Sequence, residues 1–226
     1  MLLYYITDRT QLAGTDVERR TRLLERIVQA AEAGVDWIQL REKDLSARSL
    51  ARLAEEALRR IEPRRTKLLI NSRLDVALAV GAAGVHLTSN DLAAGQARSV
   101  AAHSGIAASG FLVGVSCHSI SEVRLAAGSG ADFALLAPIF EKVLMPQTVT
   151  WAAQGAAGNA KLPGIGCEAI REASRSVSLS ILALGGVTVA NAGLCLAAGA
   201  AGVAAIRLFQ EGDLMDTVRS LRALQP

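Results

Sequence analysis

The feature that most constrains this chain is a short pattern that occurs four times. Each occurrence is a helix end, a glycine-containing turn and an apolar strand, at 33–36, 81–85, 130–133 and 199–203. Between them, short apolar runs alternate with apolar residues at helical spacing, so strand and helix alternate about eight times over 226 residues. This count predicts a single-domain TIM (β/α)8 barrel over 1–226. A doubly wound open sheet stays an alternative, because a strand count does not show closure.

The expected strands are short and end in polar or glycine-containing segments. They cover 2–6, 36–40, 67–70, 84–87, 111–115, 132–136 and 180–184, with a last strand that ends at Ile206. The segment 137–165 follows neither period, and we expect a loop with an irregular helix there.

Composition excludes several classes of protein. The 24 basic and 21 acidic residues nearly balance, and the basic ones fall on helical stretches without interleaved aromatic residues, which argues against nucleic-acid binding. Three cysteines without a metal-type pair suggest reduced thiols. With no signal-peptide pattern and no apolar run that could span a bilayer, we expect a cytoplasmic protein with no membrane partner. Whether it is a homo-oligomer stays open.

A glycine pair marks the first candidate site. Gly185 and Gly186 follow the strand 180–184 and precede a helix, whose free N–H groups and dipole favour an anion. Thr188 and Asn191 are positioned to cap this helix, and Arg207 follows the next strand as a possible phosphate partner. The alternative is that the glycine pair forms only a tight turn.

A barrel also gathers other strand ends at one rim, where TIM-barrel active sites lie. The polar residues at these ends are Gln39, Arg41, Lys43, Asn71, Ser72, His86, Asp91, Ser116, His118, Lys142 and Arg207. We therefore expect a functional site at this rim, although the gathering of polar residues does not name its substrate.

Each of these signals has an ordinary structural alternative. Arg41-Glu42-Lys43 could be a solvated charge run instead of a phosphate site. Asp91 could bind Mg²⁺ together with substrate phosphates, or merely cap the following helix. His86 and His118 both lie at strand ends, where an imidazole suits proton transfer, although His86 lies in a strand-like run that favours a core role.

Several motifs together are more specific than any one of them. In order they are Tyr5-Ile6-Thr7-Asp8, Gln39-Leu40-Arg41-Glu42-Lys43, Ile70-Asn71, Gly84-Val85-His86-Leu87, Gly114-Val115-Ser116, Pro138-Ile139-Phe140, Gly185-Gly186-Val187-Thr188 and Gly202-Val203-Ala204. This set resembles the thiamine phosphate synthase superfamily, which includes the thiazole tautomerases, over nearly the whole chain. The resemblance implies a TIM barrel in thiamine biosynthesis.

The resemblance also implies roles for individual residues. In the synthases a pyrimidine diphosphate loses pyrophosphate, and the thiazole phosphate nitrogen captures the resulting cation. By resemblance, Gln39, Arg41, Lys43 and Asn71 lie on the pyrimidine-diphosphate side, and Asp91 matches one of two magnesium aspartates. Ser116 matches a residue near the reacting groups, and Gly186 matches part of the thiazole-phosphate seat. Mg²⁺ is expected as a cofactor only if the protein is a synthase.

The chain departs from the synthase pattern at several positions. Ser72 stands where the pattern has the other magnesium aspartate, and Met145 stands at the position of a lysine, for which Lys142 is a possible substitute. Ala137 replaces a glycine, and Arg207 replaces a serine near the thiazole phosphate.

These departures favour the tautomerase branch, which also lacks the second aspartate. Its members carry a histidine in a Ser-x-His-Ser setting, here Ser116 to Ser119. We therefore expect a barrel that binds thiazole phosphate and uses His118 as a proton carrier, with Ser116 and Lys43 as further catalytic groups. The alternatives are an authentic thiamine phosphate synthase and a silent phosphate-binding or regulatory protein.

Overall fold

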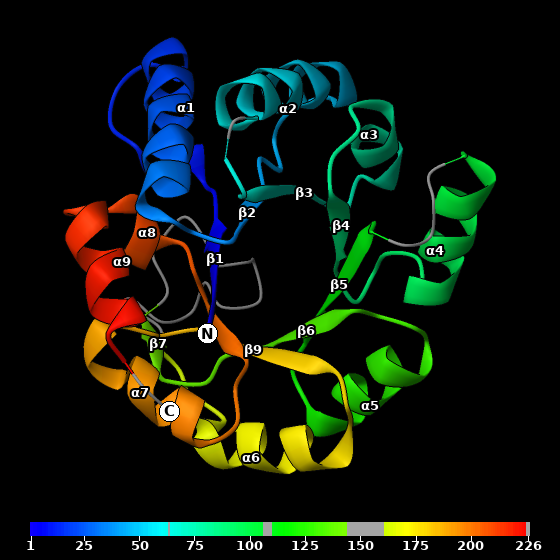
Figure 1. The fold of residues 1–226 in the computed structure, drawn as a ribbon, viewed down its shortest axis with the longest axis vertical. Coiled ribbons are helices and arrows are strands. Elements are labelled where there is room, and N and C mark those ends of the chain that lie inside the picture. The colour runs from blue at the N-terminus through cyan, green and yellow to red at the C-terminus, as the bar shows by residue number, and fades with distance from the viewer. Residues whose placement is uncertain (63, 106–109, 144–160, 225–226) are drawn as a thin grey trace, which may run out of the picture.

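The computed structural model describes residues 1–62, 64–105, 110–143 and 161–224. Eight parallel strands close into a barrel in the order β1-β10-β9-β6-β5-β4-β3-β2, with the helices outside (Figure 1). Closure is direct, since β1 pairs with both β2 and β10, through Tyr4 with Trp37 and Tyr4 with Ala204. The predicted TIM barrel is confirmed, and the open sheet is wrong.

The barrel strands lie close to their predicted ranges. They are β1 (Leu2–Ile6), β2 (Trp37–Leu40), β3 (Lys67–Asn71), β4 (Gly84–Leu87), β5 (Leu112–Cys117), β6 (Phe133–Leu136), β9 (Ser180–Leu184) and β10 (Gly202–Ala205). The helices are η1 (Arg9–Gln11), α1 (Asp16–Ala33), α2 (Ala47–Ile61), α3 (Leu74–Ala79), α4 (Ala94–His103), α5 (Ile120–Gly128), α6 (Gly166–Ser176), α7 (Val189–Ala197), α8 (Arg207–Gln210) and α9 (Leu214–Arg222).

Besides shifts of one residue at several strand ends, three differences from the prediction affect the site. β5 runs on to Cys117, so Ser116 belongs to the strand rather than to the loop after it. β10 stops at Ala205, and Arg207 opens α8 instead of ending a strand. In 137–165, the described residues form two short antiparallel strands, β7 (Lys142–Val143) and β8 (Lys161–Leu162), where an irregular helix was expected. Residues 144–160 lie outside the described part.

The barrel interior is a packed aromatic core. Tyr4, Leu69, Phe133 and Leu182 form one buried cluster inside the strands, and the Phe133 ring lies 5.5 Å from the Tyr4 ring between centroids. A Cβ added at Gly114 would lie 2.1 Å from Phe133 Cζ, so glycine makes room for that ring. Large side chains thus fill the barrel interior at the level of this cluster. A ligand can therefore bind at the mouth of the barrel, where the carboxyl ends of the strands lie.

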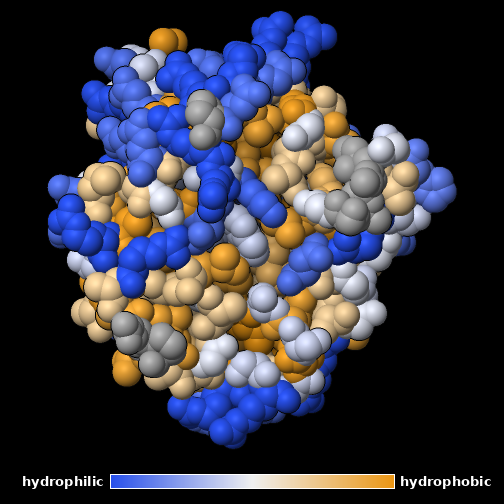
Figure 2. Space-filling view, viewed as in Figure 1, coloured by the Kyte–Doolittle hydropathy of each residue, from blue (hydrophilic) through white to orange (hydrophobic). Residues whose placement is uncertain are grey.

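The outer core lies between the strands and the helices. In α1, Leu23, Leu24 and Ile27 are buried, and a capping box between Thr15 and Glu18 begins the helix. Figure 2 shows hydrophilic residues gathered over α1 and α6, with apolar residues exposed nearer the middle of that face. Among the described helices, none combines the length and apolar character needed to cross a membrane.

Candidate functional site

Strand alternation turns several predicted site residues toward the barrel axis. Leu40, Ile70 and Cys117 belong to the outer core between strands and helices. Successive residues of a strand face opposite sides, so the residues next to these three face the interior. They are Gln39, Asn71 and Ser116. Gln39 confirms this direction, since its Nε2 donates to the hydroxyl of the interior Tyr4 at 3.1 Å.

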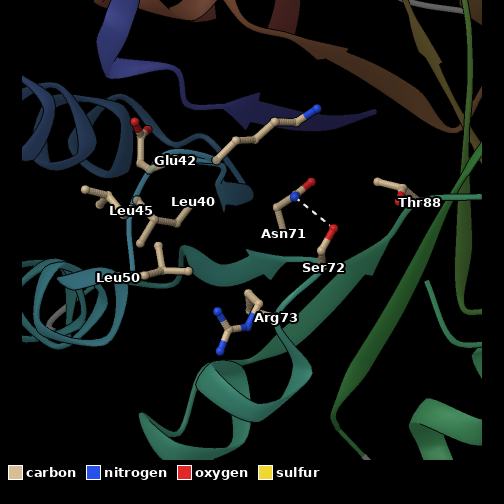
Figure 3. Close-up of a pocket in the computed structure, with 9 residues that line it drawn as sticks. Leu40, Glu42, Leu45, Leu50, Asn71, Ser72, Arg73 and Thr88 are labelled. Atoms are coloured by element: carbon tan, nitrogen blue, oxygen red, sulfur yellow. Dashed lines mark hydrogen bonds between the residues drawn. The ribbon is translucent and has the colours of Figure 1, made fainter. Parts of the chain in front are cut away.

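A cavity of ≈ 260 Å³ opens over β2 and β3 at this rim. Its lining is mixed apolar and polar, from Leu40, Glu42, Lys43, Leu45, Leu50, Asn71, Ser72, Arg73 and Thr88. Figure 3 shows Asn71 facing Ser72, and Asn71 Nδ2 donates to Ser72 Oγ at 3.0 Å. The structure therefore brings the predicted Lys43 and Asn71 to one cavity.

Arg41-Glu42-Lys43 is only partly a solvated charge run, because Glu42 is buried while Arg41 is half-buried and Lys43 is exposed. Glu42 is 4% exposed, and its side chain points away from Asn71 and Ser72 (Figure 3). Its carboxylate accepts from Thr7 Oγ1 at 2.6 Å and from the Arg9 backbone N–H at 3.0 Å. Burial raises the pKa of Glu42, and these hydrogen bonds offset part of that effect. Anchoring Glu42 on one side fixes the backbone that carries its two basic neighbours.

Arg9 completes this anchor, and the sequence analysis missed it. Although 4% exposed, Arg9 contacts Glu42 at 3.2 Å and forms a two-pronged pair with Asp44 at 2.6 and 2.8 Å. Thr7 Oγ1 in turn accepts from the Arg41 backbone N–H at 3.0 Å. The signal that could have found the anchor is Thr7 together with Arg9, directly after the first strand.

Asp91 is held as a carboxylate beside the cavity. Its Oδ2 accepts from the backbone N–H and the hydroxyl of Thr88, at 2.7 and 2.8 Å. Burial opposes ionisation, but the hydrogen bonds from Thr88 and from the Ser72 hydroxyl outweigh it and hold the pKa of Asp91 below its usual value. Asp91 lies in the turn before α4, whose N-cap is Ala93, so Asp91 is not the cap.

Ser72 has an unusual backbone. Its φ of 59° is the one positive φ outside glycine among the described residues. Its N–H donates to the His86 carbonyl at 2.8 Å, which holds that conformation. Within the described ranges, no three acidic, histidine or cysteine side chains gather as a metal site, so Asp91 is a lone carboxylate with the Ser72 hydroxyl beside it.

The two predicted histidines have different environments. His86 is 1% exposed inside the barrel, its Nε2 lies 2.8 Å from Ser116 Oγ, and burial lowers its pKa to about 3. His118 is exposed just past β5, and its Nδ1 lies 2.9 Å from the Ala137 carbonyl oxygen. That contact orients the His118 ring through Nδ1. His118 is not the helix cap, because Ser119 accepts from the Glu122 backbone N–H.

The glycine pair is packed against another strand end. Gly185 and Gly186 have φ of 93° and 67°, and Phe140 N–H donates to the Gly185 carbonyl at 3.0 Å. A Cβ at Gly186 would lie 2.8 Å from the Glu141 carbonyl oxygen. Asn191 accepts from the Thr188 N–H and donates to the Gly186 carbonyl, so α7 begins where predicted. Both the tight turn and the helix start after it are thus present.

Two other predicted cations, Arg41 and Arg207, do not line the cavity over β2 and β3. Arg207 is exposed in α8, after the loop residue Ile206. Lys142 belongs to β7 in the hairpin that follows β6. Met145 lies outside the described residues.

Comparisons with known proteins agree along the whole chain. The family model described as thiamine monophosphate synthase matches residues 3–209. A thiamine-phosphate synthase from Methanoculleus marisnigri is 41% identical over 222 residues, 97% of this chain and 93% of the relative. Another from Caldanaerobacter subterraneus subsp. tengcongensis is 32% identical over 225 residues, again 97% and 93%. A thiamine phosphate pyrophosphorylase structure from Pyrococcus furiosus superposes with a TM-score of 0.77 at 26% identity, covering 99% of this chain and 94% of that one.

These relatives carry the synthase name, so they support the synthase alternative better than the tautomerase preference drawn from the sequence. A closed barrel, a polar rim at the strand ends and similarity over the full length all point one way. The chain belongs to the thiamine monophosphate synthase family.

Proposed function

We propose that this protein is a thiamine-phosphate synthase, a transferase that joins a pyrimidine diphosphate to a thiazole phosphate with loss of pyrophosphate. The observation that carries the proposal is full-length identity of up to 41% with relatives named for this activity. The rim geometry supports it, since cationic, amide and hydroxyl side chains meet at one cavity.

In this proposal the basic pair after β2 binds the diphosphate. Arg41 and Lys43 supply positive charge, which stabilises the negative charge that develops as the bond to the leaving group breaks. Glu42 does not contact the diphosphate in this proposal. Its hydrogen bonds to Thr7 and Arg9 instead fix the backbone that carries Arg41 and Lys43. Gln39 and Asn71 face the interior, where their amides can orient a pyrimidine.

The residues fit a magnesium ion that takes most of its ligands from phosphates and water. Asp91 offers an ionised carboxylate, and Ser72 offers a neutral hydroxyl beside it. Mg²⁺ is commonly held by one or two carboxylates plus substrate phosphates, and there it would neutralise charge on the diphosphate. With a single carboxylate, affinity for free Mg²⁺ should be weak, and binding should depend on the diphosphate.

The glycine loop before α7 is the proposed seat of the thiazole phosphate. Gly186 lies at this rim three residues before Val189, where α7 begins. Backbone N–H groups at a helix N-terminus favour a phosphate. Arg207, exposed in the neighbouring α8, is proposed as a secondary contact.

The test is thiamine phosphate formation from both substrates with Mg²⁺. Lys43→Met should lower kcat/KM by about 100-fold, the scale of losing one electrostatic group in a site. The matched control is Lys67→Met. Lys67 begins β3, at the end of the strand away from Asn71 and the cavity, so this variant should keep wild-type activity. No product with the wild-type protein would reject the synthase assignment.

A second candidate is thiazole tautomerisation, favoured by His118 and by Ser72 in place of a carboxylate. The His118 ring is oriented through Nδ1, so Nε2 could carry a proton to and from a thiazole. Aromatisation of the carboxythiazole phosphate by wild type, lost by about 100-fold in His118→Asn with unchanged affinity, would establish it. Binding of thiazole phosphate without either reaction would instead indicate a silent binding protein.

A further inference from the structure

His86 and Ser116 form a polar contact inside a largely apolar barrel core. His86 Nε2 lies 2.8 Å from Ser116 Oγ, across neighbouring strands β4 and β5. Ser116 is half-buried and follows Gly114 by two residues, so it faces inward one layer nearer the mouth. The histidine is thus enclosed, while the serine is within reach of a ligand.

The other ring nitrogen of His86 decides where the proton lies. Among the described residues, His86 Nδ1 is the one buried side-chain nitrogen or oxygen with no hydrogen-bond partner. The ring lies near Tyr4 and Phe133, at 6.1 and 5.8 Å between centroids, and neither ring accepts a conventional hydrogen bond there. A buried N–H without an acceptor is rarer than a bare acceptor nitrogen. The neutral ring therefore carries its proton on Nε2.

The surroundings also keep His86 neutral. Burial is the largest influence on its pKa and lowers it; Asp91 raises it by less, and Arg41 lowers it further. A cationic ring would moreover place a second, unpartnered N–H at Nδ1.

We propose that His86 is a positioning residue that sets the direction of the Ser116 hydroxyl. His86 Nε2–H donates to Ser116 Oγ, and a hydroxyl has one proton to donate. Because that proton is not used on His86, it is available to a ligand at the mouth of the barrel. Ser116 is thereby a hydrogen-bond donor to the ligand, and the ligand atom that meets it is an acceptor, such as a pyrimidine nitrogen or a diphosphate oxygen. The identity of that ligand rests on the proposed function, whereas the tautomer does not.

The tautomer is tested on the unmodified protein without any activity assay. Long-range ¹H–¹⁵N spectra of protein with ¹⁵N-labelled histidine distinguish Nε2–H from Nδ1–H rings, and His86→Gln assigns the signal among the three histidines. The expected result is the Nε2–H pattern, unchanged from about pH 5 to 8, the interval in which an exposed imidazole titrates. An Nδ1–H or cationic ring would overturn the proposal.

Kinetics then test whether the contact acts through Ser116. His86→Met removes the donor and should lower kcat/KM about 10–100-fold, whereas His86→Gln offers an amide N–H and should recover most of it. In a Ser116→Ala background, His86→Met should cost little more, because interacting residues are not additive. The control is His103→Gln on exposed α4, expected to match wild type. Full additivity of the two losses would overturn the positioning role, while a wild type without activity would reject only the proposed function.

Discussion

The two sides of the barrel mouth are held in place by different interactions. Above β2 and β3, the rim is held by buried charges, since Arg9 and Glu42 are both 4% exposed and Glu42 accepts from both Arg9 and Thr7. Above β6 and β9, the rim is held by backbone contact, where Gly186 approaches Phe140 and Glu141 too closely for a side chain.

This difference predicts different sensitivities. The side over β2 and β3 should lose stability when a charged side chain is removed, because the partners of that side chain are left buried and unpaired. The side over β6 and β9 should lose stability when a Cβ is added to a glycine, because there is no space for it and the φ values favour glycine. The three predictions below test this contrast, from the largest expected effect to the smallest.

Glu42→Leu should cause the largest loss of stability. It removes the acceptor of Thr7 Oγ1, the Arg9 N–H and one guanidinium nitrogen, all in a buried setting. We expect the free energy of unfolding to fall by about 3–5 kcal/mol, measured by chemical denaturation.

The matched control for Glu42→Leu is Glu55→Leu on the exposed side of α2, where the change should stay within about 0.5 kcal/mol. Equal effects of the two substitutions would show that the buried network does not hold this rim.

Gly186→Ala should cause a smaller loss, and Gly81→Ala provides a closely matched comparison. Their φ values are 67° and 66°, but a Cβ at Gly81 meets nothing within 4 Å while one at Gly186 lies 2.8 Å from backbone and side-chain atoms. We expect about 1 kcal/mol for Gly81→Ala from the left-handed backbone alone, and about 2–3 kcal/mol for Gly186→Ala. If the two losses are the same in thermal or chemical unfolding, close packing is not what keeps glycine at 186.

The smallest effect concerns acid stability and Asp91. Its pKa in the folded protein is below the ordinary value, since hydrogen bonds from Thr88 and Ser72 outweigh burial. The unfolded state therefore binds the proton first, so the contribution of Asp91 is present above about pH 4 and is lost as the pH falls through the folded pKa. Stability of wild type relative to Asp91→Asn should shrink as the pH is lowered below about 4.

Denaturation curves at several pH values measure this difference. A wild-type advantage over Asp91→Asn that stays constant with pH would contradict the hydrogen-bonded, ionised state of Asp91.

Local sequence pattern determined the architecture and the membership of the rim. Strand and helix periods are properties of neighbouring residues, so β1 (Leu2–Ile6) was predicted to the residue, and the turn pattern at 33–36 correctly placed the end of α1 at Ala33. In a parallel barrel all strands end at one face, which places Gln39, Asn71 and Ser116 together once the strands are known.

Only the tertiary structure decided how those side chains are held. The Glu42 network joins residues more than 30 positions apart, and the His86 ring lies beside Tyr4 and Phe133 on other strands. The end of β10 at Ala205, before Arg207, likewise could not be predicted from the sequence, because an apolar run does not reveal where pairing with neighbouring strands stops. Burial and partner choice depend on barrel closure, which brings distant segments into contact, and no local pattern encodes those contacts.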